Sequence, residues 1–334
     1  MKEVLYYRSK EHALECLICP RACLIADGKK GYCLNKHHIN GKLYATNYGK
    51  PCAVNIDPIE KKPLLHYKPQ TYTLSLGTTG CNMRCKNCQN ASISQPGFQA
   101  QNNYELLPED VVKLCLSKKI NTISFTYNEP AVFYEYMYDV AHYSKSYHIS
   151  NVMVSNGFIN PVPLKALLPY IDAANIDLKT VDATTHYKLT GVYPDAVKNT
   201  LKILKNAGVW IEITHLVIPE WTDKTESVKQ LCDWLTRNGF SSYPLHFSRF
   251  HPTYKLSHLP ITPLDVLEAA RNIALKMGMK YVYIGNVPSH EASHTYCPAC
   301  RKKVVERNSY NILHNHLRKA CCPYCGFKVD GIWA

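Results

Sequence analysis

The stretch from Tyr72 to Cys88, YTLSLGTTGCNMRCKNC, decides the fold. Its first residues, Tyr72 to Leu76, form a short apolar run that is typical of a buried strand. Directly after this run, one loop carries Cys81, Cys85 and Cys88. Three thiolates in so short a loop can bind three irons of one four-iron four-sulfur cluster, which leaves the fourth iron open. A zinc site completed from elsewhere, or scattered structural thiols, is the alternative.

The segments that follow alternate between apolar runs and amphipathic stretches. One amphipathic stretch begins near Pro108, a second runs from Asp195 to Gly208, and a third runs from Thr262 to Gly278. Such alternation predicts an α/β fold with a parallel sheet, either a partial barrel or an open doubly wound sheet. The further expected strands are Thr122–Thr126, Val152–Ser155, Ala173–Leu178, Val209–Ile218, Pro244–Phe250 and Tyr281–Ile284.

Polar residues recur where the expected strands end, which favours the barrel. Reactive residues at the C-terminal ends of several strands are typical of barrels, whereas an open sheet gathers them near its switch point. We therefore expect a partial (β/α) TIM-like barrel over residues 71–290. The strand-end residues are Asn128, Glu129, Asn156, Asp177, Lys179, Arg249, His251 and Asn286, together with the cysteine loop.

The segment before the barrel, residues 1–70, is rich in Cys, Gly, Lys and Pro and lacks a long helical period. A hairpin is expected through Gly41–Tyr44 and Tyr48–Lys50. So short a segment needs a metal to hold it together, and four cysteines are available. We favour zinc, and an auxiliary iron–sulfur cluster stays open. The four cysteines are Cys16, Cys19, Cys23 and Cys33.

The last segment, residues 291–334, carries two CPxC knuckles. Paired knuckles predict a zinc ribbon with one tetrahedral structural zinc, and rubredoxin-like iron is the alternative. Cys321 is a further candidate ligand, but Cys322 has the knuckle spacing. The expected ligands are Cys297, Cys300, Cys322 and Cys325.

Composition narrows the class of protein. The chain has 334 residues and no apolar run long enough to span a bilayer, and its first ten residues lack the apolar core of a signal peptide. We therefore expect a cytoplasmic protein without a membrane partner. In that compartment fifteen cysteines, twelve of them in three clusters, indicate metal chemistry rather than disulfides.

The formal charge of +13 invites a nucleic-acid interpretation. Metal-bound cysteine is a thiolate, however, so three occupied metal sites lower the charge to about +8. Spread over the whole chain, that charge is a weak argument for a polyanionic partner.

Several motifs, taken with the cysteine loop, resemble the radical S-adenosylmethionine (SAM) enzymes of AmmeMemoRadiSam systems, relatives of the pyruvate formate-lyase activating enzyme. The resemblance covers essentially the whole chain. One departure concerns Asn87, which stands where many superfamily members have an aromatic residue, and we assign it no role. The motifs are Asp57–Pro63, Gly77–Asn90, Thr126–Pro130, Ala174–Lys179, His246–Pro252 and Gly285–Pro288.

The resemblance implies a mechanism. SAM would chelate the open iron. An electron from the reduced cluster would then cleave SAM and release a 5′-deoxyadenosyl radical, which abstracts a hydrogen atom. Glu129 matches the acidic residue near the methionine amino group, and Asp177 with Lys179 matches a cofactor-contacting pair. Asn156 is expected at the ribose or carboxylate. No catalytic residue beyond the cluster is predicted.

The resemblance also implies partners: a reducing electron donor and, from the family name, Memo-like and AMMECR-like proteins. The substrate, a small molecule or a protein residue, stays open. One alternative function is activation of a glycyl-radical enzyme. Another, from a different class, is a basic zinc-ribbon nucleic-acid-binding protein, which we do not favour because the sequence lacks a recognisable aromatic–basic stacking motif.

Overall fold

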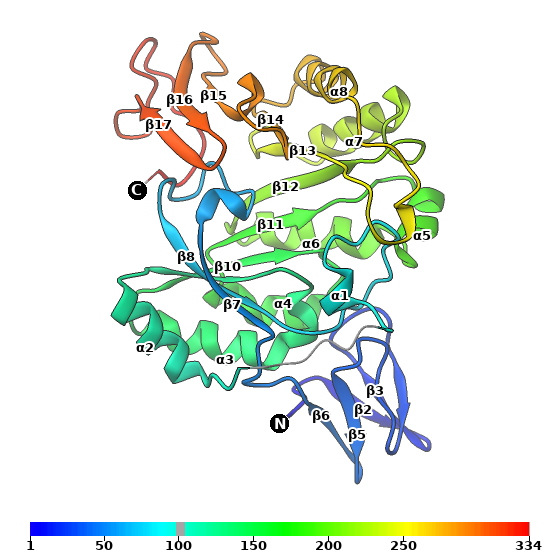
Figure 1. The fold of residues 1–334 in the computed structure, drawn as a ribbon. Helices are drawn as coiled ribbons and strands as arrows, with labels where there is room; N and C mark the ends of the chain where they lie inside the picture. Colours follow the sequence, from blue (N-terminus) through cyan, green and yellow to red (C-terminus); the bar gives the residue numbers. More distant parts are fainter. Residues whose placement is uncertain (98–103, 334) are drawn as a thin grey trace. The chain divides into compact units, whose positions relative to one another are not determined.

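The computed structural model describes residues 1–97 and 104–333 and divides into two compact units (Figure 1). The first unit comprises Met1–Asp57, Tyr72–Ala174 and Asp195–Val209. The second unit comprises Pro58–Thr71, Asn175–Pro194 and Trp210–Ala334.

The first unit begins with two three-stranded antiparallel sheets, ordered β1-β6-β5 and β2-β3-β4. Asn40 and Gly41 both have positive φ, as a tight two-residue hairpin turn between β5 and β6 requires. The predicted hairpin is therefore wrong in its second half, because β6 pairs back onto β5 rather than forward onto Tyr48–Lys50. The strands are β1 (Lys2–Glu3), β2 (Tyr7–Lys10), β3 (Ala13–Cys16), β4 (Leu24–Ala26), β5 (Lys36–Ile39) and β6 (Lys42–Ala45).

Parallel strands form the rest of the first unit. β9 pairs with both β8 and β10, with Ile123 opposite Leu74 on one side and Asn151 on the other. All four residues of β9 are buried, as expected for a parallel strand covered on both faces. Helix α3 packs on β10 and α2 packs on α3. The elements are β7 (Ala53–Pro58), β8 (Tyr72–Gly77), α1 (Ala91–Ser94), α2 (Pro108–Lys118), β9 (Thr122–Phe125), α3 (Tyr134–Lys145), β10 (Ser150–Ser155), α4 (Pro161–Leu167) and α6 (Asp195–Asn206).

The second unit repeats this pattern. Strand β13 pairs in parallel with β12 and β14, and α8 packs on α7, β13 and β14. A three-stranded antiparallel sheet, β15-β16-β17, follows. Strand β11 (Ala173–Asp177) crosses the boundary between the units along the chain. The other elements are α5 (Ala183–Thr190), β12 (Trp210–Val217), α7 (Thr225–Arg237), β13 (Leu245–Arg249), α8 (Leu264–Lys276), β14 (Val282–Gly285), β15 (Thr295–Tyr296), β16 (Lys303–Asn308) and β17 (Asn311–Asn315).

The predicted α/β class is confirmed. Each of the seven expected strands corresponds to one strand from β8 to β14, and the three expected helices are α2, α6 and α8. Strand β7 was not predicted; its residues Asn55 and Ile56 are exposed, so it lacks the apolar run of a buried strand. Within the residues described, no helix is long and apolar enough to cross a membrane.

Candidate functional site

The cysteine loop follows β8 directly, as the sequence predicts. Cys81 is buried, and its Sγ lies 3.4 Å from the backbone nitrogen of Met83. The Sγ of Cys88 lies 3.0 Å from Oγ of Ser94, at the end of α1. Burial raises the pKa of the Cys81 thiol well above its usual range, and the carboxylate of Glu129 and the neighbouring thiols raise it further. Metal binding would offset the cost of ionising this buried thiol, because the metal cation compensates the charge of the thiolate.

Glu129 and Asn156, both predicted at the site, lie beside the loop. Glu129 follows β9 and is buried; its Oε1 accepts hydrogen bonds from the backbone N–H of Ala131 and the hydroxyl of Ser155, at 2.8 and 2.9 Å. Its Oε2 accepts the backbone N–H of Asn156 at 2.8 Å. Glu129 thus joins the ends of β9 and β10, in addition to any contact with a cofactor.

Asn156 continues this connection to the cysteine loop. Its Nδ2 donates to Oδ1 of Asn82 at 2.9 Å and lies 3.7 Å from Sγ of Cys81. Asn82 in turn donates to the carbonyl of Phe158 at 2.8 Å. The C-terminal ends of β8, β9 and β10 therefore meet through side chains, at the edge where parallel α/β sheets bind ligands. Sequence reasoning missed Asn82 and Ser155, because nothing in their local pattern marks them.

The loop's composition fits an iron–sulfur cluster with a bound organic ligand. None of its cysteines is in a disulfide. Oδ1 of Asn87 and Oε1 of Gln95 are buried and, among the described residues, find no hydrogen-bond partner. Buried polar atoms normally have a partner, so an additional group at this loop would explain both.

Asp177 and Lys179, the other predicted pair, belong to the second unit. Oδ2 of Asp177 lies 2.7 Å from Nζ of Lys179, just after β11. The lysine side chain is 15% exposed and the aspartate 32%, so the pair is partly shielded from water. Arg249, one of the strand-end residues, donates through Nε to the carbonyl of Thr262 at 2.7 Å, so its side chain anchors the segment that follows β13.

The C-terminal cysteines converge on a point in the second unit. Among the described residues, they are the group whose ligand atoms all lie within 4.8 Å of one another. The Sγ atoms of Cys297 and Cys325 are 3.6 Å apart, and those of Cys300 and Cys322 are 3.7 Å apart. Four thiolates around one zinc at about 2.3 Å would be about 3.8 Å apart, which matches. Cys322, rather than Cys321, completes the group.

The N-terminal cysteines also gather, in the first unit. Cys16, Cys19, Cys23 and Cys33 line one pocket, which Lys36 and Asn82 also line. Burial raises the pKa of the Cys19 thiol, and the other three thiols raise it further. The structure thus brings together the four cysteines that the sequence groups.

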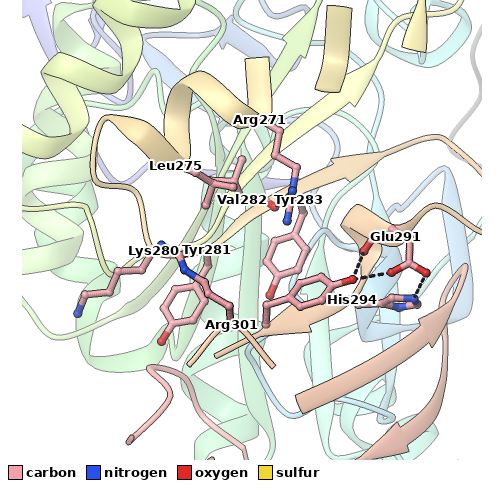
Figure 2. A pocket seen from close by; sticks show the side chains of 10 residues that line it. Arg271, Leu275, Lys280, Tyr281, Val282, Tyr283, Glu291, His294 and Arg301 are labelled. Carbon is pink, nitrogen blue, oxygen red and sulfur yellow. Dashed lines mark hydrogen bonds and ion pairs between the residues drawn. The ribbon is translucent and has the colours of Figure 1, made fainter. Parts of the chain in front are cut away.

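A larger cavity of about 280 Å³ lies in the second unit and holds none of the predicted site residues (Figure 2). Arg271, Lys280 and Arg301 contribute cations to its lining. Its carboxylate, Glu291, accepts a hydrogen bond from the Tyr296 hydroxyl at 2.5 Å. No local sequence pattern predicts this cavity, because its lining comes from several separate segments: α8, β14 and the residues around and after them.

Comparisons with known proteins identify the family. The profile of the radical SAM superfamily matches residues 75–235, the part that holds the cysteine loop, Glu129 and Asn156. The chain is 43% identical to the uncharacterized protein MJ0808 of Methanocaldococcus jannaschii over 333 residues, 99% of each chain. It is 24% identical to the pyruvate formate-lyase 1-activating enzyme of Escherichia coli K12 over 223 residues, covering 61% of this chain and 89% of the relative.

The fold is likewise similar to a solved radical SAM methyltransferase from Sphaerobacter thermophilus, with a TM-score of 0.50 and 13% identity. That alignment covers 66% of this chain and 68% of the methyltransferase. These relatives do not support the nucleic-acid alternative. The chain belongs to the radical SAM superfamily, as a relative of the pyruvate formate-lyase activating enzymes.

Proposed function

We propose that this enzyme holds a four-iron four-sulfur cluster through Cys81, Cys85 and Cys88 and uses it to cleave SAM reductively. The observation that carries the proposal is the junction of Cys81, Asn156 and Glu129 at the ends of three parallel strands. When bound, the cluster supplies an open iron that chelates SAM and the electron that releases a 5′-deoxyadenosyl radical.

The chain's own residues hold and orient these groups. Asn156 directs an amide N–H toward the Cys81 sulfur, and such hydrogen bonds tune a cluster's potential. Glu129 places a buried carboxylate beside the loop, where an ammonium group of SAM would find a charged acceptor. We assign Asp177 and Lys179 to the cofactor as well, on the strength of the family motif. A partial barrel would bring the ends of all the strands to one mouth.

The hydrogen donor is proposed to be a partner protein or a small molecule within an AmmeMemoRadiSam system. The motifs quoted for that family support this assignment, and they make Memo-like and AMMECR-like proteins the partners to test first. A low-potential electron-donor protein is required as well. The C-terminal cysteines are proposed to hold a structural zinc, because a closed four-thiolate site leaves no position for a substrate.

A second candidate function is activation of a glycyl-radical enzyme. The similarity to the E. coli activating enzyme favours it, and so does the Asp-x-Lys motif at Asp177. Under this alternative, a partner enzyme incubated with this protein, SAM and a reductant would acquire a stable radical detectable by electron paramagnetic resonance (EPR). Turnover of SAM on a small molecule without any partner radical would reject it.

The cofactor site is tested by EPR of the anaerobically reconstituted, dithionite-reduced protein. SAM is expected to change the cluster's signal, because it binds an iron directly. A signal that SAM leaves unchanged would contradict the proposal. The Cys52→Ala variant, whose cysteine belongs to none of the three groups, serves as the control and should respond like the wild type.

A further inference from the structure

We infer that the N-terminal cysteines Cys16, Cys19, Cys23 and Cys33 bind a multi-iron, four-iron four-sulfur cluster rather than the zinc that the sequence favours. The role that we assign to this N-terminal cluster rests on the proposed function, whereas the identity of its metal does not. It follows from the absence of zinc-like spacing among the four described sulfurs and from the residues that surround them.

The spacing of the cysteine sulfurs differs between the metal sites. Ligands of one zinc ion lie about 3.8 Å apart, and the C-terminal group, with all its Sγ atoms within 4.8 Å, meets this condition. In the part of the chain that the structure describes, neither the N-terminal set nor the Cys81 triad forms such a group. In a four-iron cluster each cysteine binds a different iron, so its sulfurs stand further apart. In the spacing of its sulfurs, the N-terminal set therefore resembles the Cys81 triad and differs from the C-terminal group.

The four N-terminal thiols nevertheless share one pocket. Cys16 ends β3, and its backbone N–H donates to the carbonyl of Cys23 at 3.0 Å, which closes the loop between them. Cys33 comes from the loop before β5, and all four cysteines line the pocket with the apolar Ile18 and Ile25. A partly apolar shell around four thiolates suits a cluster, because apolar surroundings limit its contact with water.

Charge supports a buried metal at this site. Four thiolates around either a zinc ion or a four-iron cluster carry a net negative charge, which is costly to bury without a cation nearby. Lys36 lines the same pocket, and its side chain is only 2% exposed. Arg21 also lines it and holds its guanidinium 3.5 Å from the ring centre of Tyr32.

The pocket also adjoins the loop of the proposed SAM-binding cluster. Nε of Arg21 donates to the carbonyl of Asn82 at 2.5 Å, and Asn82 itself lines the pocket. A Cβ built on Gly80, next to Cys81, would lie only 2.1 Å from the carbonyl oxygen of Cys33. Gly80 thus allows the backbones of the two cysteine groups to touch, which places the two metal sites side by side.

This position gives the N-terminal cluster a role that zinc, which has no redox chemistry, could not have. A low-potential donor protein would reduce it by one electron. The reduced N-terminal cluster would then pass that electron to the oxidised cluster of the triad and return to its own oxidised state. Both transfers conserve electrons, and neither makes or breaks a covalent bond.

The test uses the full-length protein, reconstituted anaerobically with iron and sulfide in the presence of zinc. A Cys81→Ala/Cys85→Ala/Cys88→Ala variant lacks the triad, so its iron reports on the N-terminal group alone. We expect about four irons and four sulfides in this variant, about eight in the wild type, and about four in a Cys19→Ser/Cys23→Ser variant. The triad variant's reduced EPR signal should not respond to SAM, because all four of its irons have protein ligands.

A triad variant with zinc but no iron and sulfide at the N-terminal group would overturn the inference. Failure of the proposed function would give a different result. In that case the Cys19→Ser/Cys23→Ser variant would bind iron but would not cleave SAM even with excess dithionite. The relay is tested with wild-type protein that is reduced and then freed of reductant. Because it stores one electron on each of two clusters, it should release about twice as much 5′-deoxyadenosine as the Cys19→Ser/Cys23→Ser variant treated in the same way. Equal yields would reject the relay.

Discussion

Lys36 and Glu135, ninety-nine residues apart, form an ion pair in the interior of the first unit. Their side chains are 2% and 0% exposed. Burial is the largest influence and works to lower the pKa of Lys36, but the charge and hydrogen bond of Glu135 together with the thiols of Cys33 and Cys16 raise the pKa above its ordinary value. Because the pKa is raised, the lysine stays charged at every pH at which the protein would be studied. The pair therefore joins α3 to the wall of the N-terminal cysteine pocket.

Removing Lys36 should destabilise the first unit strongly. A Lys36→Met variant leaves Glu135 buried without its cation, which typically costs about 3–5 kcal/mol of unfolding free energy. Urea denaturation of the metal-loaded protein measures the change. The matched control is Lys42→Met, which breaks the exposed pair with Glu3 and should leave the free energy of unfolding nearly unchanged. Equal losses of unfolding free energy in the two variants would show that the buried pair stabilises the protein no more than the exposed pair does.

Zinc should be lost from the C-terminal group when one ligand is replaced. The Cys300→Ser variant is expected to retain about one zinc ion fewer per chain, because a structural site needs all four ligands. Cys321→Ser provides the control, since that cysteine lies outside the group, and should keep its zinc. Elemental analysis measures both. Iron in place of zinc would favour the rubredoxin-like alternative, and zinc loss in Cys321→Ser would contradict the ligand assignment.

Acid should destabilise the second unit through two buried histidines. Burial lowers the pKa of His66 and of His215 from 6.5 to about 4. The unfolded rings therefore take up protons below about pH 6.5 while the folded rings stay neutral, so stability is full above that pH and falls toward pH 4. The expected loss at pH 5 is about 2 kcal/mol per ring.

Urea denaturation at pH 7.5 and pH 5 measures this dependence, with metal content assayed at both values. The His215→Gln variant should show a smaller fall in the free energy of unfolding between pH 7.5 and pH 5 than the wild type. Replacement of the exposed His12 by Gln should leave that fall unchanged. An unchanged pH dependence in His215→Gln would show that this ring is protonated equally in both states.

Asn156 should tune the cluster of the triad. The Asn156→Ala variant removes the amide that lies 3.7 Å from Sγ of Cys81. Because hydrogen bonds to cluster sulfurs favour the reduced form, we expect a more negative reduction potential and, at a fixed potential of the electron donor, a smaller reduced fraction of the cluster. An EPR-monitored redox titration checks the first expectation.

A control for this variant is Asn160→Ala, whose amide donates to the carbonyl of Leu17 at 2.8 Å instead of facing a thiol. Its potential should match that of the wild type. If Asn156→Ala also leaves the potential unchanged, its role is confined to holding Asn82.

The sequence predicted the α/β strands well because a parallel strand buried on both faces must be a continuous apolar run, as in β9. It missed β7, whose exposed residues follow no such pattern, and it misplaced the hairpin at Gly41, whose turn with Asn40 pairs β6 with the preceding strand β5. The same limit applies to the metals. Spacing along the chain groups Cys16 with Cys19, Cys23 and Cys33, but only the fold shows how far apart their sulfurs lie.

The central claim, that the Cys81 triad generates a radical from SAM, is tested most directly by quantifying 5′-deoxyadenosine. The protein is reconstituted anaerobically with iron and sulfide, reduced with dithionite and supplied with SAM. We predict that the wild type and the Cys52→Ala control release 5′-deoxyadenosine and that Cys85→Ala releases none. A wild-type protein that carries iron and sulfide at the triad yet leaves SAM intact, or a Cys85→Ala variant that still cleaves it, would contradict the account.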